Sequence, residues 1–221
     1  MPTTLHDPTF RGVLDRLRAA AARDADHLPH EDGPPTPLGA RERAESFQDC
    51  YLPVSEPGGE LLYCLARAVR PTTVVEFGTS FAISTLYLAA ALTDNDHGRV
   101  FGTELSRTKV ESARNNLAEA GLDDRVTILP GDARQALAEV PGPVELVLLD
   151  GWKDLCLPVL RLLETRLAPG ALVVADDIEF PAMAGYLAFV RDPANGYVSV
   201  PFPVEDGMEI SCWTGPAGTR A

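Results

Sequence analysis

Five short apolar runs alternate with helical patterns between residues 73 and 191, and this alternation constrains the fold more than any other feature. Apolar runs that can form buried strands lie at 74–77, 100–105, 126–129, 144–149 and 171–174. Helically spaced apolar residues follow them, at 83–92, 107–120, 133–139, 154–166 and 182–191. Such an order predicts an α/β, Rossmann-like fold whose mostly parallel, doubly wound sheet is covered on both faces.

The end of the chain departs from this pattern. Two runs at 197–200 and 208–213 are joined by a loop that contains Asp206-Gly207. A short loop with this dipeptide favours pairing of consecutive strands. We therefore expect an antiparallel C-terminal hairpin at the edge of the sheet.

The N-terminal part precedes the first strand of the alternation. Helical patterns lie at 9–24 and 40–49, and four prolines between them make residues 28–39 a loop or linker. A further helix follows and ends before Pro71. We divide the chain into residues 1–57, a helical lid with a proline-rich loop, and residues 58–221, the Rossmann-like catalytic domain. A helix that merely packs against the domain is an equally good interpretation of the N-terminal pattern.

Composition excludes several classes of partner. A chain of 221 residues with a formal net charge of −13 is a poor ligand for nucleic acid and for an anionic membrane. No apolar run approaches the roughly 20 residues of a membrane helix, and the first residues do not resemble a signal peptide. The four cysteines are scattered, which suggests reduced thiols and a cytoplasmic protein. All four histidines lie outside the motif loops, so a zinc site built on histidine is not expected.

Acidic residues follow two of the predicted strands directly. Asp150 ends the run 144–149, and Asp176 and Asp177 end the run 171–174. In open α/β sheets, ligands bind at the carboxyl ends of the strands, and three carboxylates gathered there need a cation. We therefore expect Mg²⁺ or another divalent cation. The alternative is that these aspartates cap a helix and a solvated turn.

Lys153 stands close to this acidic cluster in the sequence. The chain has seventeen arginines and only two lysines, Lys109 and Lys153. A guanidinium cannot replace an amine whose pKa must be tuned, so Lys153 is a candidate general base. Next to a cation its pKa should be lowered. An exposed lysine at the start of a helix is the competing interpretation.

Other strand ends carry residues suited to an adenosine ligand. Glu76 and Gly78 end the first strand, Glu104 ends the second, and Gly131-Asp132-Ala133 follows the third. The glycine-rich Gly-x-Gly-x-x-Gly loop of dinucleotide-binding proteins is absent, which disfavours a dehydrogenase. An acid on the second strand can accept hydrogen bonds from ribose hydroxyls. Together these positions favour S-adenosylmethionine as the cofactor.

Two segments of the chain resemble motifs of a known family. The segment Asp150-Gly-Trp-Lys-Asp-Leu-Cys-Leu-Pro is similar to the Asp-x-Trp-Lys-Asp-x-x-Leu-Pro of catechol O-methyltransferases, and Ala175-Asp-Asp-Ile resembles their Ala-Asp-Asn-Val. The chain thus resembles the class I S-adenosylmethionine-dependent O-methyltransferases, in their metal-dependent catechol and caffeoyl-coenzyme A branch. The resemblance extends over residues 54–213 and implies the Rossmann-like methyltransferase fold, with a homodimer as a further expectation.

The resemblance also implies roles for individual residues. The metal ligands would be Asp150, Asp176 and Asp177, and the catalytic residues Lys153 and Asp150. The cofactor-binding residues would be Val54, Glu76, Gly78, Thr79, Ser84, Glu104, Leu105, Asp132, Ala133, Asp150 and Trp152. Among these, Glu76, Gly78 and Ser84 would hold the methionine end, and Glu104 the ribose. The adenine would contact Leu105, Ala133 and Trp152.

Three positions depart from the family pattern. Ala82 replaces a glycine near the methionine end, and Asp177 replaces an asparagine ligand of the metal. Counting back from Asp206-Gly207, Val200 takes the place of a glutamate that binds the second catechol hydroxyl. The change at Ala82 affects the methionine pocket, and the change at Asp177 adds a negative charge to the metal site. Because of the change at Val200, a simple catechol does not follow as the acceptor substrate.

These observations predict a Mg²⁺-dependent O-methyltransferase that methylates a hydroxyl of a small, catechol-like aromatic acceptor. Two alternatives stay open. One is a metal-independent small-molecule N- or O-methyltransferase, in which the acids hold an amine. The other is a non-catalytic S-adenosylmethionine-binding module.

Overall fold

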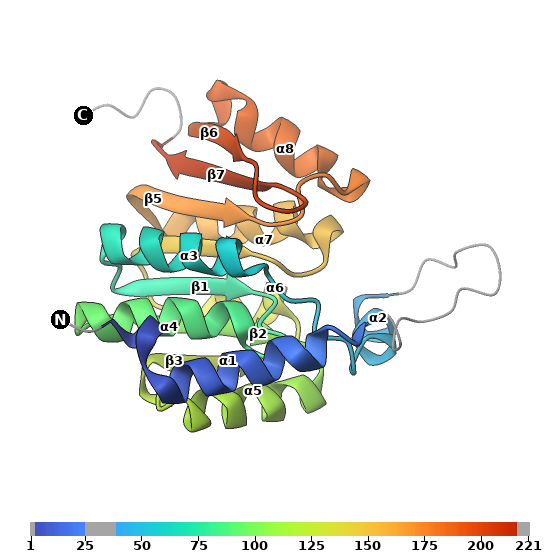
Figure 1. Ribbon diagram of the computed structural model, residues 1–221. Helices are drawn as coiled ribbons and strands as arrows, with labels where there is room; N and C mark the ends of the chain where they lie inside the picture. The colour runs from blue at the N-terminus through green and yellow to red at the C-terminus, as the bar shows by residue number, and fades with distance from the viewer. Residues whose placement is uncertain (1–2, 25–38, 216–221) are drawn as a thin grey trace.

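The chain forms a seven-stranded sheet with helices on both faces, as seen in a computed structural model that describes residues 3–24 and 39–215 (Figure 1). The strand order is β3-β2-β1-β4-β5-β7-β6. Strands β1 to β5 run parallel, and β7 pairs antiparallel with both β5 and β6. The predicted fold class and the C-terminal hairpin are therefore confirmed.

The elements follow the predicted alternation. The strands are β1 (Thr73–Phe77), β2 (Arg99–Glu104), β3 (Val126–Pro130), β4 (Val144–Leu149), β5 (Leu167–Ala175), β6 (Tyr197–Phe202) and β7 (Met208–Trp213). The helices are α1 (Pro8–Ala21), α2 (Ala40–Ser46), α3 (Glu56–Val69), α4 (Ile83–Asn95), α5 (Arg107–Glu119), α6 (Ala133–Ala136), α7 (Cys156–Leu163) and α8 (Ala184–Arg191). Most of the proline-rich segment predicted at 28–39 lies outside the described residues.

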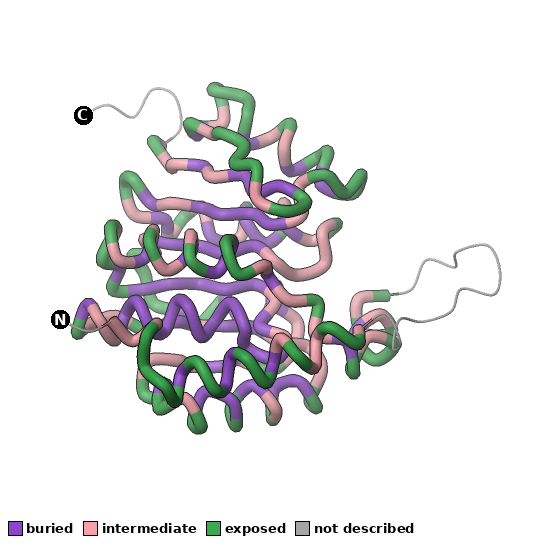
Figure 2. The backbone as a smooth tube through the Cα atoms, viewed as in Figure 1, coloured by how far each residue is buried: buried purple, intermediate pink, exposed green. Residues whose placement is uncertain are grey.

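Two hydrophobic cores lie on opposite faces of the sheet, because successive side chains of a strand point to opposite faces. Val74 of β1 packs in the core formed with α1, α3, α4 and α5. Its neighbour Val75 packs in the core formed with α6, α7 and α8. Figure 2 shows the inner strands and α4 as almost continuously buried.

Strand β5 is longer than the sequence pattern predicts. It begins at Leu167 and includes Pro169 and Gly170, which precede the strand predicted at 171–174. The pairing with β4 is irregular here: Val144 lies opposite Leu167 and Leu146 opposite Leu172. This bulge lets a proline and a glycine lie in a strand whose inner half is regular.

Helix α1 is a packing helix. Its Asp7 carboxylate caps the first turn, and Phe10, Val13, Leu14 and Leu17 are buried in the core of the domain. The apolar side of α1 is thus already used within the chain. None of the described helices is long and apolar enough to cross a bilayer.

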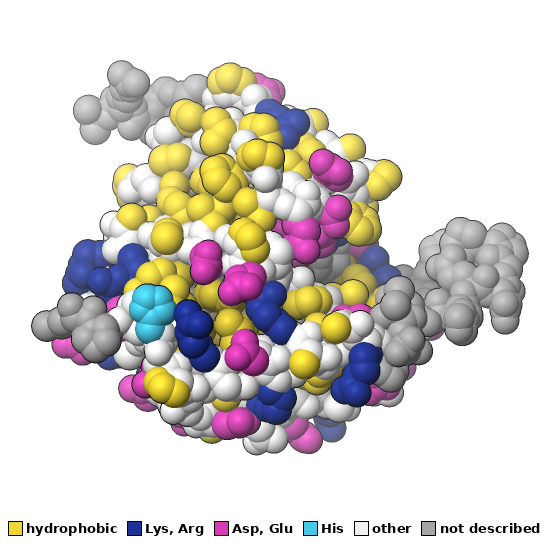
Figure 3. Space-filling model, viewed as in Figure 1, with side chains coloured by type: hydrophobic (Ala, Val, Ile, Leu, Met, Phe, Trp, Pro, Cys, Tyr) yellow, Lys and Arg dark blue, Asp and Glu magenta, His cyan; other side chains and the backbone are white. Residues whose placement is uncertain are grey.

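Exposed apolar residues gather on another part of the molecule. Val198, Val200 and Phe202 of β6 are exposed on one side of the sheet edge. In Figure 3, hydrophobic side chains form a broad patch over β5, β7, β6 and α3. A homodimer stays a prediction, and exposed apolar patches of this kind are typical of contact surfaces.

Ala82 adopts a left-handed conformation just before α4. Its φ is 72° and its side chain is fully buried. A residue with a Cβ atom is strained there, which explains why a glycine suits this position in the related pattern.

We expect Ala82→Gly to raise the free energy of unfolding by about 1 kcal/mol, because it removes this backbone strain. Thermal or urea denaturation measures the change. The control is Ala118→Gly on the exposed side of α5, where the same substitution should lower stability by up to about 1 kcal/mol. If both variants lose stability, the left-handed conformation of Ala82 is not strained.

Candidate active site

Three carboxylates meet at the carboxyl ends of β4 and β5. Leu149 lies opposite Ala175 in the parallel pair, so Asp150 and Asp176 follow directly side by side. Asp177 turns toward them with a φ of 54°. Each of Asp150, Asp176 and Asp177 offers an oxygen atom, and these three atoms all lie within 4.8 Å of one another.

Lys153 joins this acidic cluster. Its Nζ lies 3.0 Å from Asp150 Oδ1 and 2.8 Å from Asp177 Oδ2. It is therefore not an exposed lysine, since its side chain is only 15% accessible. The short helix before α7, Lys153–Leu155, carries the amine back over the end of β4.

The acidic cluster carries more negative than positive charge, and a bound cation would offset the excess. Burial, together with repulsion from Asp150 and Asp177, raises the pKa of Asp176 to about 8. Burial also raises the pKa of Asp150, against the attraction of Lys153. Three carboxylates face one ammonium, so two negative charges stay uncompensated when all three are ionised. This donor set fits Mg²⁺, which prefers carboxylate oxygens.

The pKa of Lys153 corrects one expectation. Burial lowers it, but the attraction of Asp150 and Asp177 outweighs this effect and raises the pKa above its ordinary value. The lowered pKa expected from the sequence assumes a neighbouring cation. In the chain without a cation, Asp150 and Asp177 raise the pKa of Lys153 instead of letting it fall.

A cavity of about 500 Å³ adjoins the carboxylates. Predicted residues that line it are Gly78, Glu104, Leu105, Asp132, Ala133, Asp150, Trp152, Lys153 and Asp177. A smaller cavity shares Gly78 and Asp150 with it and is lined by the predicted residues Val54, Thr79 and Ser84. The structure thus brings together the residues that the sequence analysis assigns to the adenosine and to the methionine end.

Glu76 and Asp176 do not line either cavity. Glu76 is completely buried beneath the wall, where it accepts hydrogen bonds from the hydroxyls of Thr79, Ser84 and Thr85 at 2.6 to 2.9 Å. Burial raises its pKa to about 7. Its carboxyl group thus links three hydroxyl groups of the wall, and its contact with the methionine end of the cofactor stays a prediction.

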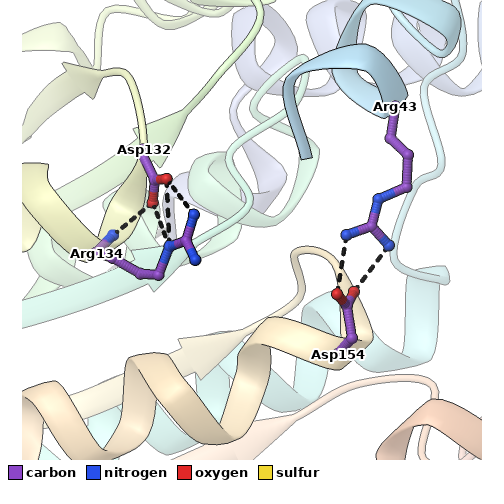
Figure 4. A network of polar contacts seen from close by, with 4 residues as sticks. All are labelled: Arg43, Asp132, Arg134 and Asp154. Carbon is purple, nitrogen blue, oxygen red and sulfur yellow. Dashed lines mark hydrogen bonds and ion pairs between the residues drawn. The ribbon is translucent and has the colours of Figure 1, made fainter. Parts of the chain in front are cut away.

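Helix α2 forms the outer wall of the larger cavity. Ala40, Arg43, Ala44 and Phe47 line it. Arg43 makes two hydrogen bonds of 2.8 and 3.0 Å to Asp154 (Figure 4). Its guanidinium carbon lies 4.8 Å from the centre of the Trp152 ring. Phe47 contacts the same ring edge-on at 5.7 Å.

Figure 4 also shows a second ion pair near this wall, between Asp132, the N-cap of α6, and Arg134 within α6. The sequence analysis assigns none of the α2 residues to the site. Their apolar pattern is too short to indicate which surface they cover.

Val200 lies away from the site. It lies on β6, where it pairs with Ile210 of β7, and does not line the cavity. The β6–β7 loop instead brings Glu205 close enough for its charge to raise the pKa of Asp150. Phe180 and Leu155 line the cavity beside the carboxylates and give this end an apolar wall.

Comparisons with known proteins agree with this geometry. A family model described as a methyltransferase domain matches residues 75–178. Mouse catechol O-methyltransferase is 25% identical over 210 residues, which cover 87% of this chain and 78% of the mouse protein. The family match and these relatives support a class I S-adenosylmethionine-dependent O-methyltransferase.

A further relative and a solved structure are also similar to this chain. The catechol O-methyltransferase of Mycobacterium tuberculosis is 33% identical over 128 residues, which span 58% of this chain and 57% of that protein. The crystal structure of cofactor-bound Rv0187 from the same species superposes with a TM-score of 0.71 at 25% identity, covering 92% of this chain and 90% of that one. Together the comparisons support S-adenosylmethionine as the methyl donor.

Proposed function

We propose that this O-methyltransferase requires Mg²⁺ or another divalent cation and methylates one hydroxyl of a small, catechol-like aromatic. The observation that carries the proposal is the cluster of three carboxylates with a single lysine beside the cofactor cavity. Relatives named catechol O-methyltransferase support the same acceptor class. Trp152, Leu155 and Phe180 supply apolar walls suited to a flat aromatic ring.

The cofactor is proposed to lie across both cavities. Its adenosine would occupy the larger cavity, with the ribose at Glu104 and the adenine near Leu105 and Ala133. Its methionine end would point toward the smaller cavity beside Ser84 and Thr79, which has a volume of about 10 Å³ in the chain alone and would have to widen. Asp150 lines both cavities, so the methyl group would lie next to the carboxylate cluster.

Lys153 is proposed to accept the proton of the acceptor hydroxyl. When bound, a divalent cation supplies positive charge that lowers the pKa of that hydroxyl and offsets the carboxylates that hold the Lys153 proton. Lys153 takes the proton as a neutral amine, and the acceptor oxygen then attacks the methyl carbon. The carbon–sulfur bond breaks, and the electron pair stays on sulfur, leaving S-adenosylhomocysteine. Positioning of the two reactants by the cavity accounts for much of the rate enhancement.

S-adenosylhomocysteine release, measured with a panel of dihydroxyphenyl acceptors, tests the proposal. We expect turnover with Mg²⁺, its loss with EDTA and its return when Mg²⁺ is added in excess. Monohydroxyphenyl acceptors of the same size are the control and should react far more slowly. Turnover that is indifferent to EDTA would make the enzyme metal-independent and leave Asp150, Asp176 and Asp177 as ordinary polar residues.

A further inference from the structure

Lys109 is the second lysine of the chain and lines the same cavity as Lys153. It lies in the first turn of α5, where the helix dipole disfavours a positive charge. Only 6% of its surface is exposed, and this burial lowers its pKa. A lysine placed at such a cost requires specific compensation.

Ser80 and Glu104 provide that compensation. Lys109 Nζ donates a hydrogen bond of 3.1 Å to Ser80 Oγ, and the charge of Glu104 favours the ammonium form. The Glu104 carboxylate in turn accepts the backbone N–H of Ser80 at 2.9 Å and that of Ser106 at 2.7 Å. Lys109, Ser80 and Glu104 thus form one connected group in the cavity wall.

Ser80 passes this connection to the N-terminal segment. Its hydroxyl donates to the backbone carbonyl of Tyr51 at 2.8 Å. An ammonium can only donate hydrogen bonds, so Lys109 occupies an acceptor position of the Ser80 oxygen and leaves its single proton for Tyr51. The Tyr51 ring stacks on Phe81 with 3.9 Å between ring centres, and Lys109 Nζ lies 5.5 Å from the centre of the Phe81 ring.

The segment held in this way covers the junction of the two cavities. Leu52 lines both of them and adopts a left-handed φ of 47°. Asp24 accepts the backbone N–H groups of Tyr51 and Leu52 at 2.8 and 2.7 Å. Lys109 therefore fixes, through Ser80, one side of the covering segment, and Asp24 fixes the other.

We infer that Lys109 is a positioning residue for the cofactor. Through Ser80, Lys109 aligns Glu104 and holds the Tyr51–Leu52 segment over the cofactor. The inference rests on the proposed placement of the ribose at Glu104. Lys109 takes no part in the proton transfer. Its loss should therefore weaken cofactor binding and leave the chemical step intact.

Calorimetric titration of S-adenosylhomocysteine into the full chain, without acceptor or metal, tests this inference. We expect Lys109→Met to raise the dissociation constant roughly ten-fold, the loss of one charge-assisted hydrogen bond. Ser80→Ala should do the same, and the double variant should lose little more, because both changes break one connection. The matched control is Arg107→Met, which removes an exposed charge from the same helical turn and should change nothing.

Steady-state kinetics complete the test. For Lys109→Met, KM for S-adenosylmethionine should rise with the dissociation constant, whereas kcat at saturating cofactor stays within about two-fold. An unchanged dissociation constant, or additive effects of the two single variants, would overturn the role of Lys109. Glu104→Gln separates the two proposals: if it leaves the affinity unchanged, the placement of the ribose is wrong.

Discussion

Asp150→Ala is expected to reduce Mg²⁺-dependent turnover by on the order of 10²–10³, while the dissociation constant of S-adenosylhomocysteine changes by less than about three-fold. The substitution removes one of three carboxylates that lie within 4.8 Å of one another and one of the two partners of Lys153. It leaves the backbone hydrogen bond of residue 150 to Phe77 in place, so the strand end should keep its shape. Turnover as a function of Mg²⁺ concentration and calorimetric cofactor binding measure the two effects.

Asp132→Ala is the matched control, because Asp132 is a carboxylate in the wall of the same cavity but outside the cluster. It caps α6 and pairs with Arg134. Its loss should alter cofactor affinity without changing the Mg²⁺ dependence. If Asp150→Ala weakens the cofactor as much as it lowers turnover, Asp150 acts on the cofactor and not through a cation.

Much of this fold follows from local patterns. A buried strand between two crossover helices has apolar residues on both faces, and the run ending in Leu149 shows this directly. The loop with Asp206-Gly207 likewise predicts pairing of β6 with β7. The position of β7 between β5 and β6 follows from no local pattern, because it depends on which of the two last strands pairs with the edge of β5.

The parts of the site that could be predicted from the sequence are those formed by the ends of neighbouring parallel strands. Asp150 and Asp176 end adjacent parallel strands, so their meeting follows from the strand order. The burial of Glu76 did not follow, since it depends on Thr85 and Ser84 turning back from α4. The wall formed by α2 could not be predicted from the sequence either, because Arg43 and Trp152 are far apart in sequence and come into contact only through tertiary packing. The scarcity of lysine was used to predict a role for Lys153 alone. The role of Lys109 depends on its contact with Ser80, which is distant in the sequence.

Lys153→Met is expected to lower kcat by on the order of 10²–10⁴, with cofactor affinity nearly unchanged, because it removes the general base. The base must be deprotonated to act, so the wild-type rate should rise with pH through the pKa of Lys153 in the Mg²⁺-loaded enzyme. The residual rate of the variant should lack this step. Without Mg²⁺, Asp150 and Asp177 raise the pKa of Lys153, which keeps it protonated and inactive as a base.

Lys153→Arg decides between a base and a structural charge. A guanidinium can replace the ammonium in its ion pairs with Asp150 and Asp177, which lie 3.0 and 2.8 Å from Nζ. It cannot lose a proton near neutral pH. If Lys153 only balances the carboxylates, the arginine variant should recover most of the activity that the methionine variant loses. If Lys153 is the base, both variants should be equally slow, since the base must be a neutral amine before it takes the proton of the acceptor hydroxyl.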